Sequence, residues 1–207
     1  LGGLAGFAMA SDDTMEQRAW VLGLSFAAQA PLLVVFMAKA RAHLGRVAPT
    51  AAIALAVFAP AALATAFITH RMLVGLGVEG ETAIGHETLA EIVAAPGEMA
   101  TWIVIAIVVL GVAVTEEVLY RGLLQPIIDT IIGATGRWPA IVSTSVVFAV
   151  LHIGAAHASA LVGLFVLSLG LGWARERSGS ITAPILVHAS FNALNIALVL
   201  SGYSTTP

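Results

Sequence analysis

The chain has 207 residues, of which 59% are apolar and only 10% are charged, and its mean hydropathy is +0.97. Soluble domains have about 45–50% apolar and about 25% charged residues, so this composition predicts an integral membrane protein without a separate soluble domain. The net charge of −3, with no basic tract, argues against a nucleic-acid partner, and the absence of cysteine excludes disulfides and thiolate metal sites.

Hydropathy windows of about 19 residues predict six membrane spans, near residues 19–38, 47–69, 99–119, 139–156, 158–174 and 181–200. These runs are continuously apolar and do not alternate, which favours helices over the strands of a barrel. We therefore expect an all-α, polytopic transmembrane helical bundle that forms a single membrane domain over residues 1–207. The apolar residues 1–10 could be the tail of a further span that begins before the given sequence.

Basic residues predict the orientation of the bundle. One side of the predicted spans carries Lys39, Arg41, Arg46, Arg137, Arg175 and Arg177. Because loops rich in lysine and arginine stay in the cytoplasm, we expect this side to be cytoplasmic. The other side holds Arg18, Arg71 and the acidic segment 79–98. Short loops and high apolar content favour the plasma membrane of a prokaryote.

The third span carries a charged cluster in Glu116, Glu117 and Arg121. A carboxylate at bilayer depth costs about 2.5–3.5 kcal/mol on insertion scales, so such a cluster indicates a functional site. On a helix, Glu117 and Arg121 share a face and can form an ion pair. Glu116 points about 100° away, is less neutralised, and is therefore the candidate general base. The alternative interpretation is an ion pair that closes a helix at the membrane interface.

The depth of Glu116 depends on where this helix ends. A span that ends at residue 119 would leave Glu116 near the cytoplasmic edge. A helix that continues to Ile128 would be about 45 Å long and would place Glu116 deep in the membrane. Gly122 and Pro126 predict a kink or a half-span in this region.

The fourth span contains His152, four residues after Phe148, so the two side chains would pack on one helix face. A lone buried histidine is usually structural, and this alternative remains open. In the fifth span, Ser168 and Gly172 are four residues apart, and small residues at this spacing let helices approach closely. They predict ordinary helix packing.

The sixth span carries His188, Asn192 and Asn195 at positions i, i+4 and i+7. This spacing makes one polar stripe along an otherwise apolar helix. Interhelical hydrogen bonds, worth about 0.6–2 kcal/mol each, could account for the stripe without any catalytic role.

Three motifs, each in an apolar segment and in this order, resemble those of the CAAX protease and bacteriocin-processing (CPBP, or Abi) family of intramembrane proteases. They are Glu116-Glu117-x-x-x-Arg121-Gly122, Phe148-x-x-x-His152 and His188-x-x-x-Asn192. Tyr120 and the segment 178–185 also look like that family. The resemblance covers residues 99–200, which would form the catalytic core. Within this family, the sequence is similar to the type II CAAX prenyl endopeptidases.

This resemblance implies hydrolysis of peptide bonds within the membrane. Glu116 would be the general base on water, and His152 would help to orient or activate that water. His188 and Asn192 would bind the carbonyl oxygen as negative charge develops on it. The residues that would support the site are Glu117, Arg121, Phe148 and Asn195.

The resemblance leaves metal dependence open, because the family is described both as metalloproteases and as glutamate-dependent proteases without a metal. If zinc is bound, its ligands would be Glu116, His152 and His188, with water in the fourth position. The implied partner is a membrane-associated peptide or protein in the lipid bilayer. It would be a prenylated CAAX-type protein, or a bacteriocin or other peptide.

Two departures limit what the resemblance implies. The eukaryotic-type prenyl endopeptidases usually have more spans than the six predicted here, so substrate access could differ. No residue pattern identifies a groove for a prenyl group.

Two other functions remain open. A proton-coupled transporter would use Glu116 and the histidines as a proton relay, although we find no internal repeat of broken helices. A non-catalytic immunity or binding protein would keep the fold and bind a peptide. Signatures of other intramembrane proteases are absent: Ala90 stands where H-E-x-x-H would need a histidine after His86, and there is no G-x-S-x-G.

Overall fold

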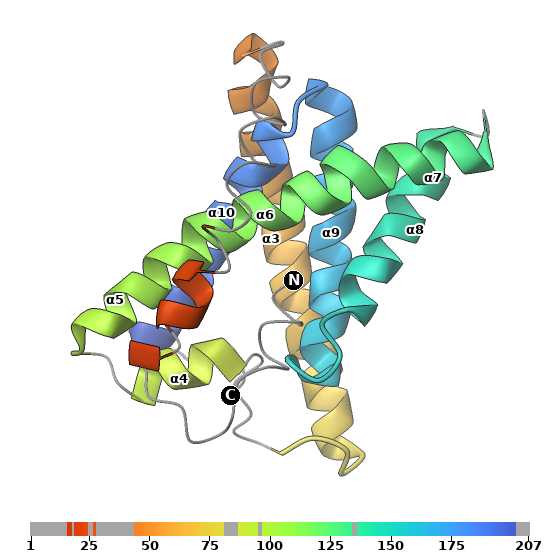
Figure 1. Cartoon of the computed structure of the whole chain (residues 1–207). Helices are drawn as coiled ribbons and strands as arrows, with labels where there is room; N and C mark the ends of the chain where they lie inside the picture. The colour runs from red at the N-terminus through yellow and green to blue at the C-terminus, as the bar shows by residue number, and fades with distance from the viewer. Residues whose placement is uncertain are drawn as a thin grey trace.

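The computed structural model describes residues 16–17, 19–24, 27, 44–80, 87–94, 97–133 and 136–201 (Figure 1). These residues are nearly all helical, and the strand-like contact within them is an isolated bridge between Ile153 and Ala156. This confirms the all-α helical membrane bundle. The first predicted span, residues 19–38, lies mostly outside the described residues.

Figure 1 labels the helices from α3 to α10. Their bounds are α3 (Leu44–Gly75), α4 (Glu87–Ala94), α5 (Met99–Ala106), α6 (Ala113–Glu117), α7 (Gln125–Ile132), α8 (Arg137–Val150), α9 (Ala158–Ser178) and α10 (Thr182–Leu200), with π-helical segments η1 (Ile107–Val112) and η2 (Val118–Leu124). Four stretches within the described ranges are long and apolar enough to cross a membrane: Gly45–Gly75, Met99–Ile132, Ala158–Ser178 and Thr182–Leu200.

Small residues let α9 pack closely against α3 in the antiparallel direction. A Cβ added to Gly163 would lie 2.9 Å from the backbone oxygen of Ala62, and Gly170 faces Phe58 at still closer range. A Cβ at Gly172 would lie 2.8 Å from the Ile141 side chain of α8. The close helix approach predicted from the small residues of this span is therefore confirmed. The core between α3, α9 and α10 contains Val47, Ala51, Ala54, Ala59, Ala62, Leu167, Leu171, Ala174, Ala183, Val187 and Phe191.

Residues 99–132 form one helix of 34 residues from α5 to α7, drawn in green and crossing obliquely in Figure 1. It continues across Gly122 and Pro126, so the predicted half-span is wrong. Pro126 lies in the first turn of α7, directly after the π-helical segment, where a missing N–H is tolerated. Glu116 lies near the middle of this helix, so the continuation of the helix beyond residue 119 is confirmed, and the depth of Glu116 in the membrane stays a prediction.

The fourth predicted span, residues 139–156, is wrong at its end. Helix α8 has 14 residues and ends at Val150. At 1.5 Å per residue it is about 21 Å long, which is shorter than the ~30 Å hydrocarbon core. Residues 151–157 turn back into α9, with Gly154 at a φ of 94°. His152 therefore lies in a turn, which hydropathy cannot detect because apolar residues continue through it.

Polar contacts connect neighbouring helices at both ends of α9. At one end, Glu79 after α3 accepts hydrogen bonds from His70 Nδ1 at 2.8 Å and from the Ser159 N–H of α9 at 2.9 Å. At the opposite end of α9, Glu176 accepts from Gln125 Nε2 at 3.0 Å. The same Glu176 pairs with Arg137 of α8 at 3.7 Å. The starts of α3 and α8 and the end of α9, which all carry arginines, therefore lie at one end of the bundle.

Candidate active site

The site is centred on α6, a five-residue α-helical stretch between two π-helical segments. Its last two residues, Glu116 and Glu117, are 2% and 0% exposed, and Arg121 in η2 is 0% exposed. Single π turns within α-helices change the direction of side chains and occur frequently at functional sites. Three ionisable groups are thus buried in the middle of a long apolar helix.

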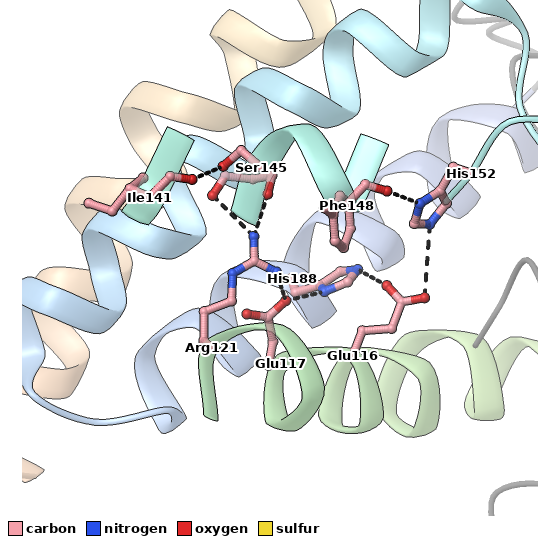
Figure 2. Close-up of polar contacts among 9 residues, drawn as sticks. Glu116, Glu117, Arg121, Ile141, Ser145, Phe148, His152 and His188 are labelled. Atoms are coloured by element: carbon pink, nitrogen blue, oxygen red, sulfur yellow. Dashed lines mark hydrogen bonds and ion pairs between the residues drawn. The ribbon is translucent and has the colours of Figure 1, made fainter. Parts of the chain in front are cut away.

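Arg121 is held from two directions (Figure 2). Its Nη1 donates to Glu117 Oε1 at 2.9 Å, across one turn of the same helix. Its Nη2 donates to Ser168 of α9, to Oγ at 2.5 Å and to the backbone oxygen at 3.1 Å. A buried charge needs such partners, because an unpaired ion in a low-dielectric interior is costly. The predicted pair of Glu117 with Arg121 is present.

His188 of α10 joins the two glutamates. Its Nδ1 lies 2.8 Å from Glu117 Oε1, and its Nε2 lies 3.9 Å from Glu116 Oε2. An ionised carboxylate only accepts hydrogen bonds, so these partners assign a proton to Nδ1. In the neutral ring, Nε2 then presents its lone pair toward Glu116.

His152 approaches Glu116 from the turn after α8. Its Nδ1 lies 2.7 Å from the backbone oxygen of Phe148, which can only accept, so Nδ1 carries the proton. Its Nε2 lies 3.9 Å from Glu116 Oε1. The two histidines therefore present the same nitrogen to the two oxygens of one carboxylate.

The spacing around Glu116 suits a water molecule. At 3.9 Å, neither histidine Nε2 is within direct hydrogen-bond distance of the carboxylate. A water about 2.8 Å from each partner could bridge either gap. Glu117, in contrast, shares Oε1 between Arg121 and His188. The arrangement can therefore place water on Glu116 while Glu117 supports His188.

Phe148 forms one wall of the site and is fully buried. Its ring centroid lies 4.7 Å from that of His152, 6.0 Å from that of His188 and 5.0 Å from that of Tyr120. The Arg121 guanidinium carbon lies 5.0 Å from the same ring, within the range of a cation–π contact. Phe148 thus contacts both histidines and covers the arginine with an apolar surface.

The two asparagines of α10 have different surroundings. Asn192 donates to the backbone oxygen of Val108 in η1 at 3.1 Å, so it links α10 to the helix that carries the glutamates. Asn195 donates to Phe191 of its own helix at 2.9 Å. An amide has two N–H groups, so the Val108 contact leaves Asn192 able to donate a second hydrogen bond. Of the predicted polar stripe, His188 makes the direct contact with the glutamates.

Ser168 is the partner of Arg121 that the sequence reasoning missed. The spacing of Ser168 and Gly172 predicted only helix packing. A signal was nevertheless available, because a guanidinium has five N–H donors and one glutamate cannot satisfy them when the group is buried. A buried arginine therefore requires further acceptors from another helix, and small polar residues of the neighbouring spans are the candidates.

The chemistry of the donors can be compared with that of a metal site. Glu116, His152 and His188 supply oxygen and imidazole nitrogen, which zinc accepts. Among the residues that the structure describes, however, no group of three or more His, Asp or Glu side chains is arranged to hold a metal ion. A zinc ion on these three residues stays a prediction.

Comparison with known proteins finds one family model that matches the part of the chain containing this site. Residues 98–194 match the family model described as Type II CAAX prenyl endopeptidase Rce1-like, and this range contains Glu116, His152, His188 and Asn192. No curated protein and no solved structure matches the chain. The family consists of CAAX-type intramembrane endopeptidases, which act on polypeptides in the bilayer. The segment 98–194, with its buried glutamates and histidines, is similar to the Rce1-like family of type II CAAX prenyl endopeptidases.

Proposed function

We propose that this protein hydrolyses peptide bonds of membrane-embedded polypeptides with a water molecule that Glu116 activates. One observation carries the proposal: each carboxylate oxygen of Glu116 lies 3.9 Å from the Nε2 of a different histidine. This spacing is too long for a direct hydrogen bond and suits a bridging water. The family match supports the reaction class, which is peptide-bond hydrolysis within the membrane.

The two glutamates would have different roles. Glu117 Oε1 is shared by Arg121 at 2.9 Å and His188 at 2.8 Å, so this oxygen is already engaged by two partners. Glu116 has no arginine beside it among its described contacts, and both of its oxygens face histidines. We assign Glu116 as the general base and Glu117 as the group that orients His188.

The reaction would proceed through a tetrahedral intermediate. Glu116 removes a proton from water, the oxygen attacks the carbonyl carbon, and the proton passes to the leaving amine as the C–N bond breaks. His152 orients the water. His188, once its Nε2 has taken up a proton from solvent, and the Asn192 amide would donate to the oxyanion, a task worth about 3 kcal/mol per donor. Glu117 offsets the positive charge of His188 in that step.

The substrate class follows from the surroundings of the site. The glutamates lie in the middle of a 34-residue apolar helix, so a substrate must reach them from within the bilayer. The family match favours a prenylated protein of the CAAX type. We therefore propose prenylated peptides as the first substrates to test, with other membrane-embedded peptides beside them.

The test is cleavage of prenylated and non-prenylated peptides by the purified protein. We expect Glu116→Gln and His188→Ala to lower the rate by at least about 100-fold, because each removes a group that acts on water or the oxyanion. Glu98→Gln is the matched control. It makes the same chemical change at the exposed residue that precedes α5, so this variant should keep full activity. Mass spectrometry of the products would locate the cleaved bond.

Two further outcomes separate the alternatives. Loss of activity with a zinc chelator, restored by added zinc, would replace the metal-free mechanism by a zinc site. Equal behaviour of the wild type and Glu116→Gln in a cellular assay, with no cleavage by either protein, would contradict catalysis and support a binding role.

A further inference from the structure

Ser168 of α9 meets Arg121 with two acceptors. The Nη2 of Arg121 lies 2.5 Å from Ser168 Oγ and 3.1 Å from the Ser168 backbone oxygen. Both residues are 0% exposed, so water cannot replace either contact. Ser168 belongs to none of the three motifs of the proposed site. It nevertheless lies at the start of a line of polar contacts that leads into that site.

The line of contacts runs through four residues from four helical elements, and Figure 2 shows its part from Arg121 through Glu117 to His188. Ser168 on α9 accepts from Arg121 on η2, and Arg121 donates to Glu117 Oε1 at 2.9 Å. The same oxygen lies 2.8 Å from Nδ1 of His188 on α10. The opposite side of that imidazole faces Glu116. Each contact fixes the group that makes the next contact.

The guanidinium explains how a position on α9 can affect His188. It is planar and rigid, so its two ends cannot move independently. Ser168 holds the Nη2 end and Glu117 holds the Nη1 end. If the hold on Nη2 loosens, Nη1 and the Glu117 carboxylate shift with it. Because Glu117 Oε1 also accepts from His188, the imidazole ring then loses its fixed direction toward Glu116.

We infer that Ser168 is a positioning residue of the proposed hydrolytic site, which holds Arg121 and thereby fixes the direction of His188 through Glu117. This inference rests on the proposed function, because the direction of His188 matters only if Nε2 takes part in the reaction. It predicts an effect on the rate of the chemical step and none on substrate binding. A displacement of about 1 Å in a catalytic group can lower a rate about 100-fold.

The kinetic test compares Ser168→Ala with Ser145→Ala. Ser145 on α8 is 1% exposed, but its hydroxyl donates only to Ile141 of its own helix among the described contacts, so it is a matched buried serine outside the line of contacts. We expect Ser168→Ala to lower kcat between about 10-fold and 100-fold with KM unchanged. Ser145→Ala should keep the wild-type kcat. Ser168→Thr, which keeps the hydroxyl, should recover most of the loss.

A double-mutant cycle tests whether Ser168 acts through Arg121. In an Arg121→Met background, Ser168→Ala should cause no further decrease in kcat, because the contact is already lost. Independent losses that multiply in the double variant would overturn the inference. Equal kcat values for Ser168→Ala and the wild type would overturn it as well, while a loss in Glu116→Gln would still support the proposed function.

A spectroscopic measurement makes the test independent of activity. In ¹⁵N-histidine-labelled protein, the ring nitrogens of His188 report the hydrogen bond at Nδ1, and the signal is assigned with His188→Gln. Ser168→Ala should change these nitrogen shifts, and Ser145→Ala should leave them in place. If Ser168→Ala leaves the His188 signals unchanged, the positioning role is wrong even where no peptide is cleaved by any variant.

Discussion

Arg121 is a buried cation whose partners come from two helices. It donates to Glu117 on its own helix and to Ser168 on α9, and its guanidinium lies 5.0 Å from the Phe148 ring. A buried ion pair gives little net stability compared with an apolar pair, but removal of one partner leaves the other charge uncompensated. The fold therefore depends on this arginine to compensate the buried charge of Glu117.

Replacement of Arg121 by methionine keeps an unbranched, although shorter, side chain and removes its charge. We expect Arg121→Met to lower the free energy of unfolding by about 3–5 kcal/mol, because Glu117 stays buried without its cation. Unfolding in detergent micelles, followed by circular dichroism, measures the change. Arg177→Met, at an exposed position, is the control and should have little effect.

A second substitution checks the physical cause. Glu117→Gln added to Arg121→Met removes the stranded carboxylate, so the double variant should be more stable than Arg121→Met alone. A double variant that is less stable than the single one would contradict the proposed origin of the loss.

At the scale of elements, Glu79 joins two helices. It accepts from His70 near the end of α3 and from the N–H of Ser159 in the first turn of α9. Burial opposes the ionisation of Glu79 most strongly and would raise its pKa by itself. The Ser159 N–H and His70 outweigh it, so the pKa of Glu79 lies below its ordinary value. The anion is therefore more stable in the folded protein than in the unfolded chain.

This lowered pKa predicts a pH-dependent stability. The contribution of Glu79 is fully present above the unfolded pKa of about 4.3 and is lost as the pH falls through that value and the lower folded pKa. We expect the melting temperature of Glu79→Gln to lie below that of the wild type at pH 7 and the difference to shrink below pH 4. Differential scanning fluorimetry from pH 7 to pH 3 measures both proteins.

Glu98→Gln makes the same change at an exposed position and should follow the wild-type curve over this range. A constant difference between the wild type and Glu79→Gln down to pH 3 would contradict the role assigned to the ionised Glu79.

At the scale of the whole molecule, four arginines lie at one end of the described bundle: Arg46, Arg137, Arg175 and Arg177. The antiparallel packing of α9 on α3 places the end of α9 beside the start of α3, and Arg137 pairs with Glu176 there. The turn after α3, which contains Val78, lies at the other end. The clustering of Arg137, Arg175 and Arg177 agrees with the cytoplasmic side predicted from the sequence.

Thiol labelling tests this orientation. The chain has no cysteine, so Val78→Cys and Arg177→Cys each introduce a single thiol at an exposed position. We expect a membrane-impermeant maleimide to label Val78→Cys in intact cells and Arg177→Cys only after permeabilisation. The opposite pattern would reverse the predicted topology, and labelling of both in intact cells would contradict a fixed orientation.

Long apolar segments were the part of the fold that the sequence predicted best. The helices around residues 47–69, 158–174 and 181–200 follow from continuous apolar runs, because the bilayer accepts a backbone only when its polar groups are paired. The end of α8 could not be predicted in this way. Apolar residues continue from α8 into residues 151–153, and the turn there depends on Gly154 and on the packing of α9.

The sequence by itself determined that this is a helical membrane protein and that Glu116, Glu117, Arg121, His152 and His188 are its unusual polar groups, because charge in an apolar span is costly and therefore easily recognised. The tertiary structure alone decided how these groups meet. Which glutamate oxygen faces which imidazole nitrogen, and that Ser168 holds Arg121, depend on contacts between residues far apart in the sequence. Helical periodicity describes only neighbours within a few residues, so packing between helices had to supply the rest.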